Sequence, residues 1–234
     1  MTLFTFKVPW KDNLLCGDTC QAGCRAMVLH GAGQSSRSRF FRLRDALCRR
    51  GIPSAGFDFV GHGETGGKLL GSTLCERTQQ SAAVIRHVCR EPLTLIAASM
   101  SAHTAIQLTR FFNVETLVLL VPAVYTRRAY HLPFGPEFSA AIRLPESWME
   151  SDAFDALTGF RGNLLVVAAE CDATIPAEIP RSIHDAASNA ASRLLHIVPA
   201  AGHRSLFRRD RDFNYVLDLI DGGSCAGMTE RSGT

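Results

Sequence analysis

Three features that would set this chain of 234 residues apart from an ordinary globular domain are missing. No apolar run approaches the ~20 residues that cross a bilayer, so we expect no membrane span. The net charge is only +3, which is too small to indicate a nucleic-acid partner. Residues 1–10 alternate apolar and polar side chains and lack the basic start, apolar core and cleavage site of a secretory leader. We therefore expect a cytoplasmic protein.

Metal and cofactor signatures are also missing, although the chain has eight cysteines. Cys16, Cys20 and Cys24 are spaced four residues apart, which matches none of the usual paired zinc spacings. Without a leader, the cysteines are expected to be free, buried thiols. Residues 61–66 fit the letters G-x-G-x-x-G, but no helix opens there and no acidic residue follows at the usual distance. We expect neither a metal nor a cofactor.

Apolar runs rich in β-forming residues alternate with segments of helical periodicity along most of the chain. Strands are expected at 2–8, 13–16, 25–29, 54–59, 93–98, 116–121, 164–169 and 194–198. Helices are expected at 40–50, 75–90, 100–112, 179–191 and 206–220. Continuously apolar strands are typical of a parallel sheet that is covered on both faces. The prediction is one α/β domain over residues 1–220, with a mostly parallel central sheet flanked by helices on both faces.

Two segments depart from this alternation. Residues 122–162 contain several prolines and aromatic residues and are too long for a plain crossover between two strands, so we expect them to form a small cap. Residues 221–234 are rich in glycine, serine and threonine, and we expect a disordered tail.

Ser99 lies between the apolar strand 93–98 and the helical segment that follows at once. A serine on such a sharp strand–turn–helix connection projects its hydroxyl from the end of a sheet, above the positive end of the helix. This arrangement exposes a nucleophile. An isolated serine there would more simply be a helix N-cap. Ser101 is a second candidate nucleophile, although it would lie within the helix.

Asp172 and His203 also follow predicted strands, and the carboxyl ends of parallel strands meet at one edge of a sheet. His203 would take the proton of Ser99 during attack on a carbonyl, and Asp172 would orient the imidazole. Glu170 is the alternative acid. The oxyanion formed by the attack needs N–H donors, for which the backbone amides of Met100 and Ala32 are the candidates.

Several motifs in this order resemble those of the α/β-hydrolase superfamily, over nearly the whole chain. The stretch His30-Gly31-Ala32-Gly33 resembles the oxyanion loop. Residues 58–65 are similar to D-x-R-G-H-G-x-S, with Val60 and Thr65 in place of Arg and Ser. Residues 97–102 are similar to G-H-S-M-G-G, with Ala97 and Ser101 in place of two glycines. The remaining matches are the acid loop at residues 170–176 and the histidine loop at residues 201–203.

The resemblance implies an α/β-hydrolase fold with a small cap and hydrolysis of a carboxylic ester or thioester through an acyl-enzyme. The substrate would be a small acyl compound, and an apolar acyl pocket is expected from Phe134, Phe138, Trp148 and Met149, with His131 also within reach. Clusters of arginine at residues 37–50 and 204–211 suggest an alternative, an acyltransferase or a thioesterase acting on an acyl carrier protein or a coenzyme A thioester. A scaffold that binds a small molecule without catalysis is the other alternative.

Overall fold

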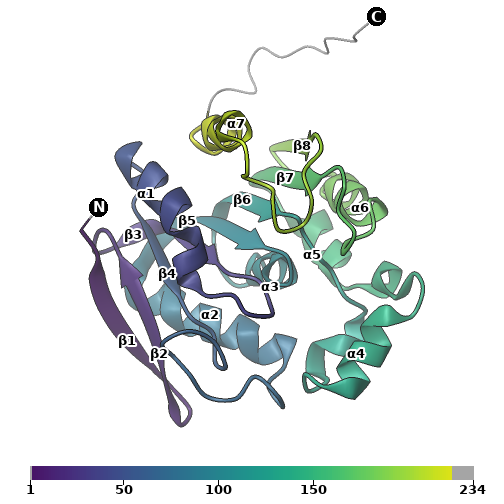
Figure 1. The fold of residues 1–234 in the computed structure, drawn as a ribbon, viewed down its shortest axis with the longest axis horizontal. Helices are drawn as coiled ribbons and strands as arrows, with labels where there is room; N and C mark the ends of the chain where they lie inside the picture. Colours follow the sequence, from purple (N-terminus) through teal and green to yellow (C-terminus); the bar gives the residue numbers. More distant parts are fainter. Residues whose placement is uncertain (1, 223–234) are drawn as a thin grey trace, which may run out of the picture.

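A twisted sheet of eight strands forms the centre of the fold, in the order β1-β2-β4-β3-β5-β6-β7-β8 (Figure 1). The computed structural model describes residues 2–222. The strands are β1 (Phe4–Trp10), β2 (Asn13–Thr19), β3 (Cys24–Leu29), β4 (Ser54–Phe57), β5 (Cys89–Ala98), β6 (Val114–Leu120), β7 (Asn163–Ala169) and β8 (Ser192–Val198). Strand β2 pairs antiparallel with both β1 and β4, and the other neighbours are parallel. The predicted mostly parallel sheet is confirmed.

Helices cover both faces of this sheet, as predicted. The α-helices are α1 (Phe41–Arg49), α2 (Leu74–Val88), α3 (Ser101–Leu108), α4 (Pro136–Arg143), α5 (Ala153–Gly159), α6 (Glu178–Ala186) and α7 (Asp210–Ile220). Helices α1 and α7 share one buried cluster with the sheet, whereas α2, α3, α5 and α6 contribute to the cluster on the other face.

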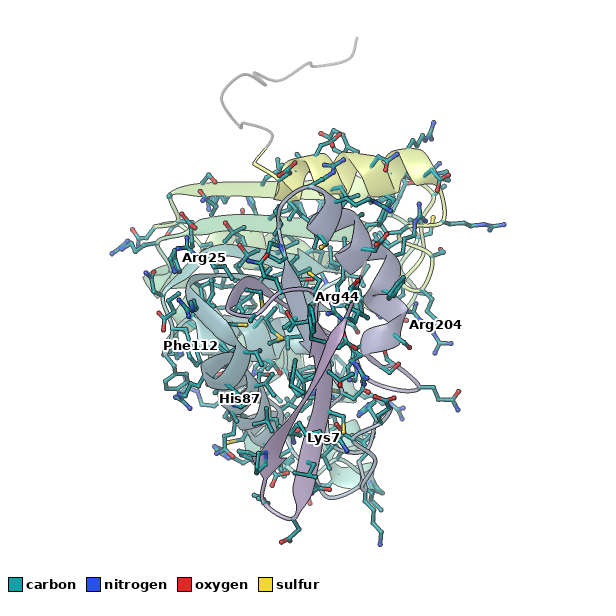
Figure 2. All side chains as sticks on the ribbon, turned by 90° about the vertical axis from the view of Figure 1, so that its left-hand side faces the viewer. Lys7, Arg25, Arg44, His87, Phe112 and Arg204 are labelled. Atoms are coloured by element: carbon teal, nitrogen blue, oxygen red, sulfur yellow. The ribbon has the colours of Figure 1, made fainter. Side chains whose placement is uncertain are left out.

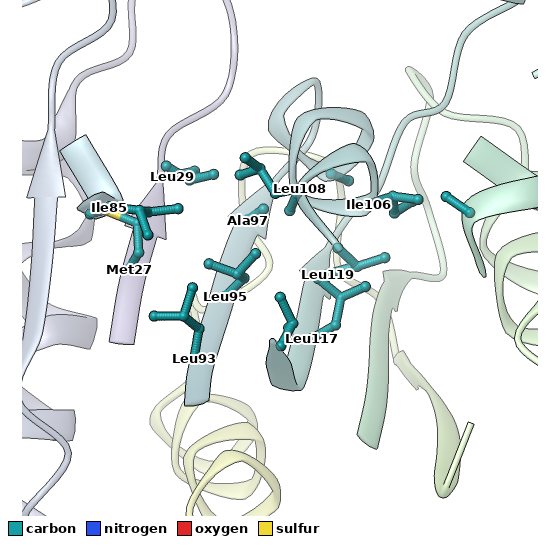
Figure 3. Close-up of a cluster of buried hydrophobic side chains, with 14 of the residues drawn as sticks. Met27, Leu29, Ile85, Leu93, Leu95, Ala97, Ile106, Leu108, Leu117 and Leu119 are labelled. Atoms are coloured by element: carbon teal, nitrogen blue, oxygen red, sulfur yellow. The ribbon is translucent and has the colours of Figure 1, made fainter. Parts of the chain in front are cut away.

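Strand β5 shows how the two clusters arise from one strand. Leu93, Leu95 and Ala97 belong to the cluster under α2 and α3, and Figure 3 shows them one after another along β5, with Leu108 near Ala97. Ile96 and Ala98 belong to the opposite cluster. Because successive side chains of a strand point to opposite faces, an unbroken apolar run is required when both faces are buried.

Some helix boundaries differ from the prediction. The last helix begins at Asp210 instead of residue 206, and two acidic residues, Asp210 and Asp212, occupy its first turn. Negative side chains there favour the positive end of the helix dipole. Leu206 is buried in the turns that precede this helix, so its apolar character reflects core packing. The predicted tail lies outside the described residues from 223 onwards.

The segment between β6 and β7, where a cap is expected, contains α4, α5 and two 3-10 helices, η2 (Arg127–His131) and η3 (Ser147–Glu150). Ala129, Phe134 and Phe138 form a separate buried cluster with Leu74 and Met100. Helix α5 instead packs into the main core through Ala153, Ala156 and Leu157. The first part of the segment therefore packs beside the start of α3, where Ser99 lies.

None of the helices formed by residues 2–222 is both long and apolar enough to cross a membrane.

Candidate active site

Ser99 lies on a tight turn between β5 and α3. Its φ angle is +53°, a left-handed conformation that serine rarely adopts. Three backbone hydrogen bonds stabilise it: its N–H donates to the carbonyl of Leu120 at 2.9 Å, and its carbonyl accepts from Ala102 at 2.9 Å and Ala123 at 3.1 Å. Ser99 thus lies between the carboxyl end of β5 and the start of α3, as the sequence pattern predicts.

His203 and Asp172 meet Ser99 at this edge of the sheet. The Asp172 carboxylate can only accept, so His203 Nδ1–H donates to its Oδ2, at 2.8 Å. The neutral imidazole then presents Nε2 as an acceptor, and the Ser99 hydroxyl lies 3.0 Å from it. The side chains of His203 and Asp172 are 17% and 8% exposed, so the hydrogen-bonded chain is largely shielded from water.

Two loops hold Asp172 and His203 in place. Oδ1 of Asp172 accepts from the N–H groups of Thr174 and Ile175 at 2.8 and 2.9 Å, which turns Oδ2 toward the histidine. Glu170, the alternative acid, instead accepts from the N–H of Ala200 at 2.7 Å, in the loop before His203. Glu170 thus ties the acid loop to the histidine loop and does not contact the imidazole.

Ser101, the alternative nucleophile, is fully buried. Its hydroxyl donates to the carbonyl of His30 and accepts from the Arg77 guanidinium at 2.8 Å. It makes no hydrogen bond to His203, whose Nε2 is occupied by Ser99. The geometry therefore favours Ser99 over Ser101.

The two candidate oxyanion donors flank Ser99. Met100 precedes α3 in helical conformation, and Gly31, next to Ala32, packs against Ser99 so closely that a Cβ on Gly31 would lie 3.2 Å from Ser99 Cβ. Within residues 2–222, neither the Ala32 nor the Met100 backbone N–H donates to another protein group. Both amides thus remain available to an oxygen of a bound molecule.

The residues expected to line an acyl pocket do not gather in one place. Phe134 and Phe138 contact each other edge to face and are buried in the cluster that contains Met100. Trp148 packs edge to face on Phe154 and the main core. Met149 is 54% exposed and lines a surface depression with Arg127 and Arg128. His131 is exposed and stacks edge-on against Tyr130.

A cavity of about 210 Å³ lies beside Asp172, on the side of β7 and β8. Its wall is mostly apolar and includes Val121, Pro122, Ile175 and Ile197. The predicted pocket residues are not part of it. Its lining combines strand ends, the acid loop and the start of α6, and no single sequence pattern marks such a combination.

Sequence reasoning also missed Arg77, which is 1% exposed and donates to the carbonyl of His30. It stands in a predicted helix among other polar residues, where an arginine ordinarily lies in solvent. Its contacts are with the loop at His30 and Gly31, with Phe59 and with Ser101 of α3. No local pattern signals this packing.

The cysteines of the described residues are free, as expected, but of these only Cys24 is buried. Cys171 is exposed, and the others are half-buried. In the same part of the chain, no group of three or more His, Cys, Asp or Glu side chains is arranged to hold a metal ion.

No protein-family model matches the sequence, and a search of curated proteins finds no match either. Several solved structures, in contrast, are similar to the structure of this chain. A serine hydrolase from Cycloclasticus zankles has a TM-score of 0.71 at 15% identity, with 96% of this chain and 100% of that chain covered. Est1E from Butyrivibrio proteoclasticus, solved with ferulic acid bound, has a TM-score of 0.69 at 16% identity, covering 93% and 97%.

A thioesterase domain from the curacin biosynthetic pathway has a TM-score of 0.69 at 14% identity, covering 94% of this chain and 99% of that chain. At such low identity, these comparisons show a shared fold. Because coverage is high on both sides, the shared fold extends over nearly the full length of each protein.

Proposed function

We propose that this chain, which has the α/β-hydrolase fold, is a serine hydrolase that cleaves a small carboxylic ester or thioester through an acyl-enzyme. The observation that carries the proposal is the continuous hydrogen-bonded chain from Ser99 through His203 to Asp172. The strained turn at Ser99 adds support, because backbone strain of this kind concentrates at functional sites.

In the acylation step, Ser99 Oγ attacks the carbonyl carbon of the substrate while His203 Nε2 takes the hydroxyl proton. Asp172 stabilises the imidazolium that results. The carbonyl oxygen becomes an oxyanion, for which the N–H groups of Ala32 and Met100 are the proposed donors. When the intermediate collapses, the bond to the leaving alcohol or thiol breaks and His203 returns the proton to that group.

In the deacylation step, water replaces the leaving group. His203 removes a proton from the water as its oxygen attacks the acyl carbon, and a second tetrahedral intermediate uses the same N–H donors. Its collapse releases the carboxylic acid and returns the proton to Ser99. The protein's own side chains supply every proton transfer in this cycle.

Charge pairing favours a small substrate over an acidic carrier protein. Most arginines of the two clusters pair with carboxylates: Arg37 with Asp18, Asp58 and Glu64, Arg44 with Asp18, Arg42 with Asp210, Arg49 with Asp45, Arg50 with Asp218, and Arg209 and Arg211 with Asp212. Figure 2 shows Arg44 inside the fold and Arg204 at its periphery. The positive charge available to attract a carrier is correspondingly reduced.

The test is covalent labelling with a fluorophosphonate, which phosphonylates activated serines, followed by mass spectrometry. We expect one adduct, on Ser99, and none in Ser99→Ala. The same substitution should lower kcat/KM for p-nitrophenyl acetate by roughly 10⁴-fold or more, since it removes the nucleophile. Ser192→Ala, on the edge strand β8, is the matched control and should be labelled and active like the wild type.

An adduct on Ser101, or a Ser99→Ala protein that is still labelled, would contradict the assignment of the nucleophile. A folded wild type that is neither labelled nor active on esters and thioesters would contradict the proposed hydrolase and favour a binding role.

A further inference from the structure

We propose that Arg77, held by Ser101, is a positioning residue that aims the backbone N–H of Ala32 at the oxyanion. This inference rests on the proposed hydrolase function, because it concerns how one donor of that site is oriented. Arg77 belongs to α2 and touches neither Ser99 nor His203 through a hydrogen bond. It acts through the oxyanion loop.

The Arg77 guanidinium contacts the oxyanion loop directly. Its Nη2 donates to the carbonyl of His30 at 2.9 Å and lies 3.5 Å from the carbonyl oxygen of Gly31. The same nitrogen donates to Ser101 Oγ at 2.8 Å, and Ser101 in turn donates to the His30 carbonyl. Arg77 and Ser101 therefore hold the loop from the side opposite to the substrate.

The His30 ring holds the next peptide of the loop, between Gly31 and Ala32, through its carbonyl. The N–H of Phe59 donates to Nε2 at 3.2 Å, so Nδ1 carries the hydrogen and donates to the Gly31 carbonyl at 2.8 Å. Burial, reinforced by the charge of Arg77, holds the pKa of His30 well below its usual range. The ring therefore remains neutral, and Nε2 remains an acceptor for Phe59.

Peptide geometry converts this anchoring into the direction of a donor. The peptide between Gly31 and Ala32 is trans, since the cis bond of the described residues lies at Glu91–Pro92. In a trans peptide the C=O and the N–H point in opposite directions. A Gly31 carbonyl directed at His30 and Arg77 therefore turns the Ala32 N–H away from them. Because Gly31 packs against Ser99, the proposed direction of this N–H is toward the nucleophile.

A purely stabilising role does not account for Arg77. No carboxylate of residues 2–222 pairs with it, and its Nε and Nη1 are buried without a hydrogen-bond partner. Its planar group stacks on Phe59, with Cζ 3.6 Å from the ring centre. Burying a cation without a counterion costs free energy. The positive charge of Arg77 lies on the carbonyl side of the Gly31–Ala32 peptide, where it makes the Ala32 N–H a stronger donor.

The experiment compares Arg77→Met, Arg77→Lys and Ser101→Ala with the wild type, using p-nitrophenyl acetate. We expect Arg77→Met to lower kcat by about 10- to 100-fold while KM changes less than about 2-fold, because the oxyanion exists only in the transition state. Its melting temperature should be unchanged or higher, since a buried charge is replaced by an apolar side chain. Arg77→Lys should recover part of kcat, and Ser101→Ala should lose part of it.

A second measurement reports directly on how well the protein stabilises the oxyanion. Affinity for a trifluoromethyl ketone, which forms a charged tetrahedral adduct with the serine, should fall by the same factor as kcat in each variant. Arg86→Met is the matched control: it removes an exposed arginine from the same helix and should leave both quantities unchanged.

Two results with an active wild type would overturn the inference: kcat of Arg77→Met within about 2-fold of the wild type, or a loss of kcat that is matched by a fall in melting temperature and not rescued by lysine. A wild type that is neither labelled by fluorophosphonate nor active would overturn the proposed function, and this inference with it.

Discussion

Ser99 is the candidate nucleophile, and its backbone adopts a conformation that is unfavourable for any residue with a Cβ. Its φ of +53° places it in the left-handed region, where a side chain costs roughly 1–2 kcal/mol. The surrounding hydrogen bonds to Leu120, Ala102 and Ala123 impose this conformation. The strain is the consequence of ending a buried strand and starting a helix within one residue.

This strain can be measured by comparing two substitutions at one position. Ser99→Ala removes the hydroxyl and keeps the Cβ, whereas Ser99→Gly removes both. We expect the glycine variant to be more stable than the alanine variant by about 1 kcal/mol in urea denaturation, although both are inactive. Equal stabilities would mean that the turn stores no strain at Ser99.

Helix α2 is the element that carries Arg77, and its start is set by a capping residue. Thr73 has extended backbone angles, and its side chain accepts from the N–H of Glu76 at 3.0 Å. Threonine followed three residues later by glutamate is the sequence signature of a capping box. The cap fixes where the helix begins, and with it the face on which Arg77 lies.

Removing this cap should destabilise the protein by a predictable amount. Thr73→Ala leaves the Glu76 N–H without its acceptor and should lower the free energy of unfolding by about 1 kcal/mol. Thr73→Ser retains the oxygen and should stay within a few tenths of a kcal/mol of the wild type. A serine variant as unstable as the alanine variant would show that the methyl group, rather than the hydrogen bond, stabilises α2.

At the scale of the whole molecule, histidines that are neutral in the folded state make stability depend on pH. His103 is fully buried on α3, accepts from the N–H of Tyr125 at 3.4 Å and has Asp152 4.0 Å away. Burial lowers its pKa from 6.5 to about 4, against a smaller opposing effect of Asp152. As the pH falls, His103 takes up a proton near pH 6.5 in the unfolded chain but only near pH 4 in the folded chain.

Between pH 6.5 and about 4 the unfolded state therefore binds more protons at His103, and stability falls as the pH falls. The contribution is about 1.4 kcal/mol per pH unit for one histidine. His103→Asn should reduce the slope of unfolding free energy against pH in this window by about that amount. His87→Asn, at an exposed position, is the control. An unchanged slope in His103→Asn would show that His103 is protonated in the folded protein.

Local patterns in the sequence were sufficient for most of the architecture. The apolar runs of β3, β5, β6 and β7 predict their strands because both faces of each are buried. The positions of Ser99, Asp172 and His203 after predicted strands indicated that they would meet, since the carboxyl ends of parallel strands share one edge of a sheet. The strand–turn–helix pattern predicted that Ser99 lies on a tight turn, because an apolar run and a segment of helical periodicity adjoin it directly.

The tertiary structure alone decided the surroundings of these residues. Phe134 and Trp148 are both apolar residues of one segment, yet they pack into different clusters, because their neighbours come from distant elements. Glu170 and Asp172 lie two residues apart in one loop, and the fold directs Glu170 to Ala200 and Asp172 to His203. Arg77 is buried against loops and a helix that come from distant parts of the chain, and such long-range packing leaves no periodic signal in the sequence.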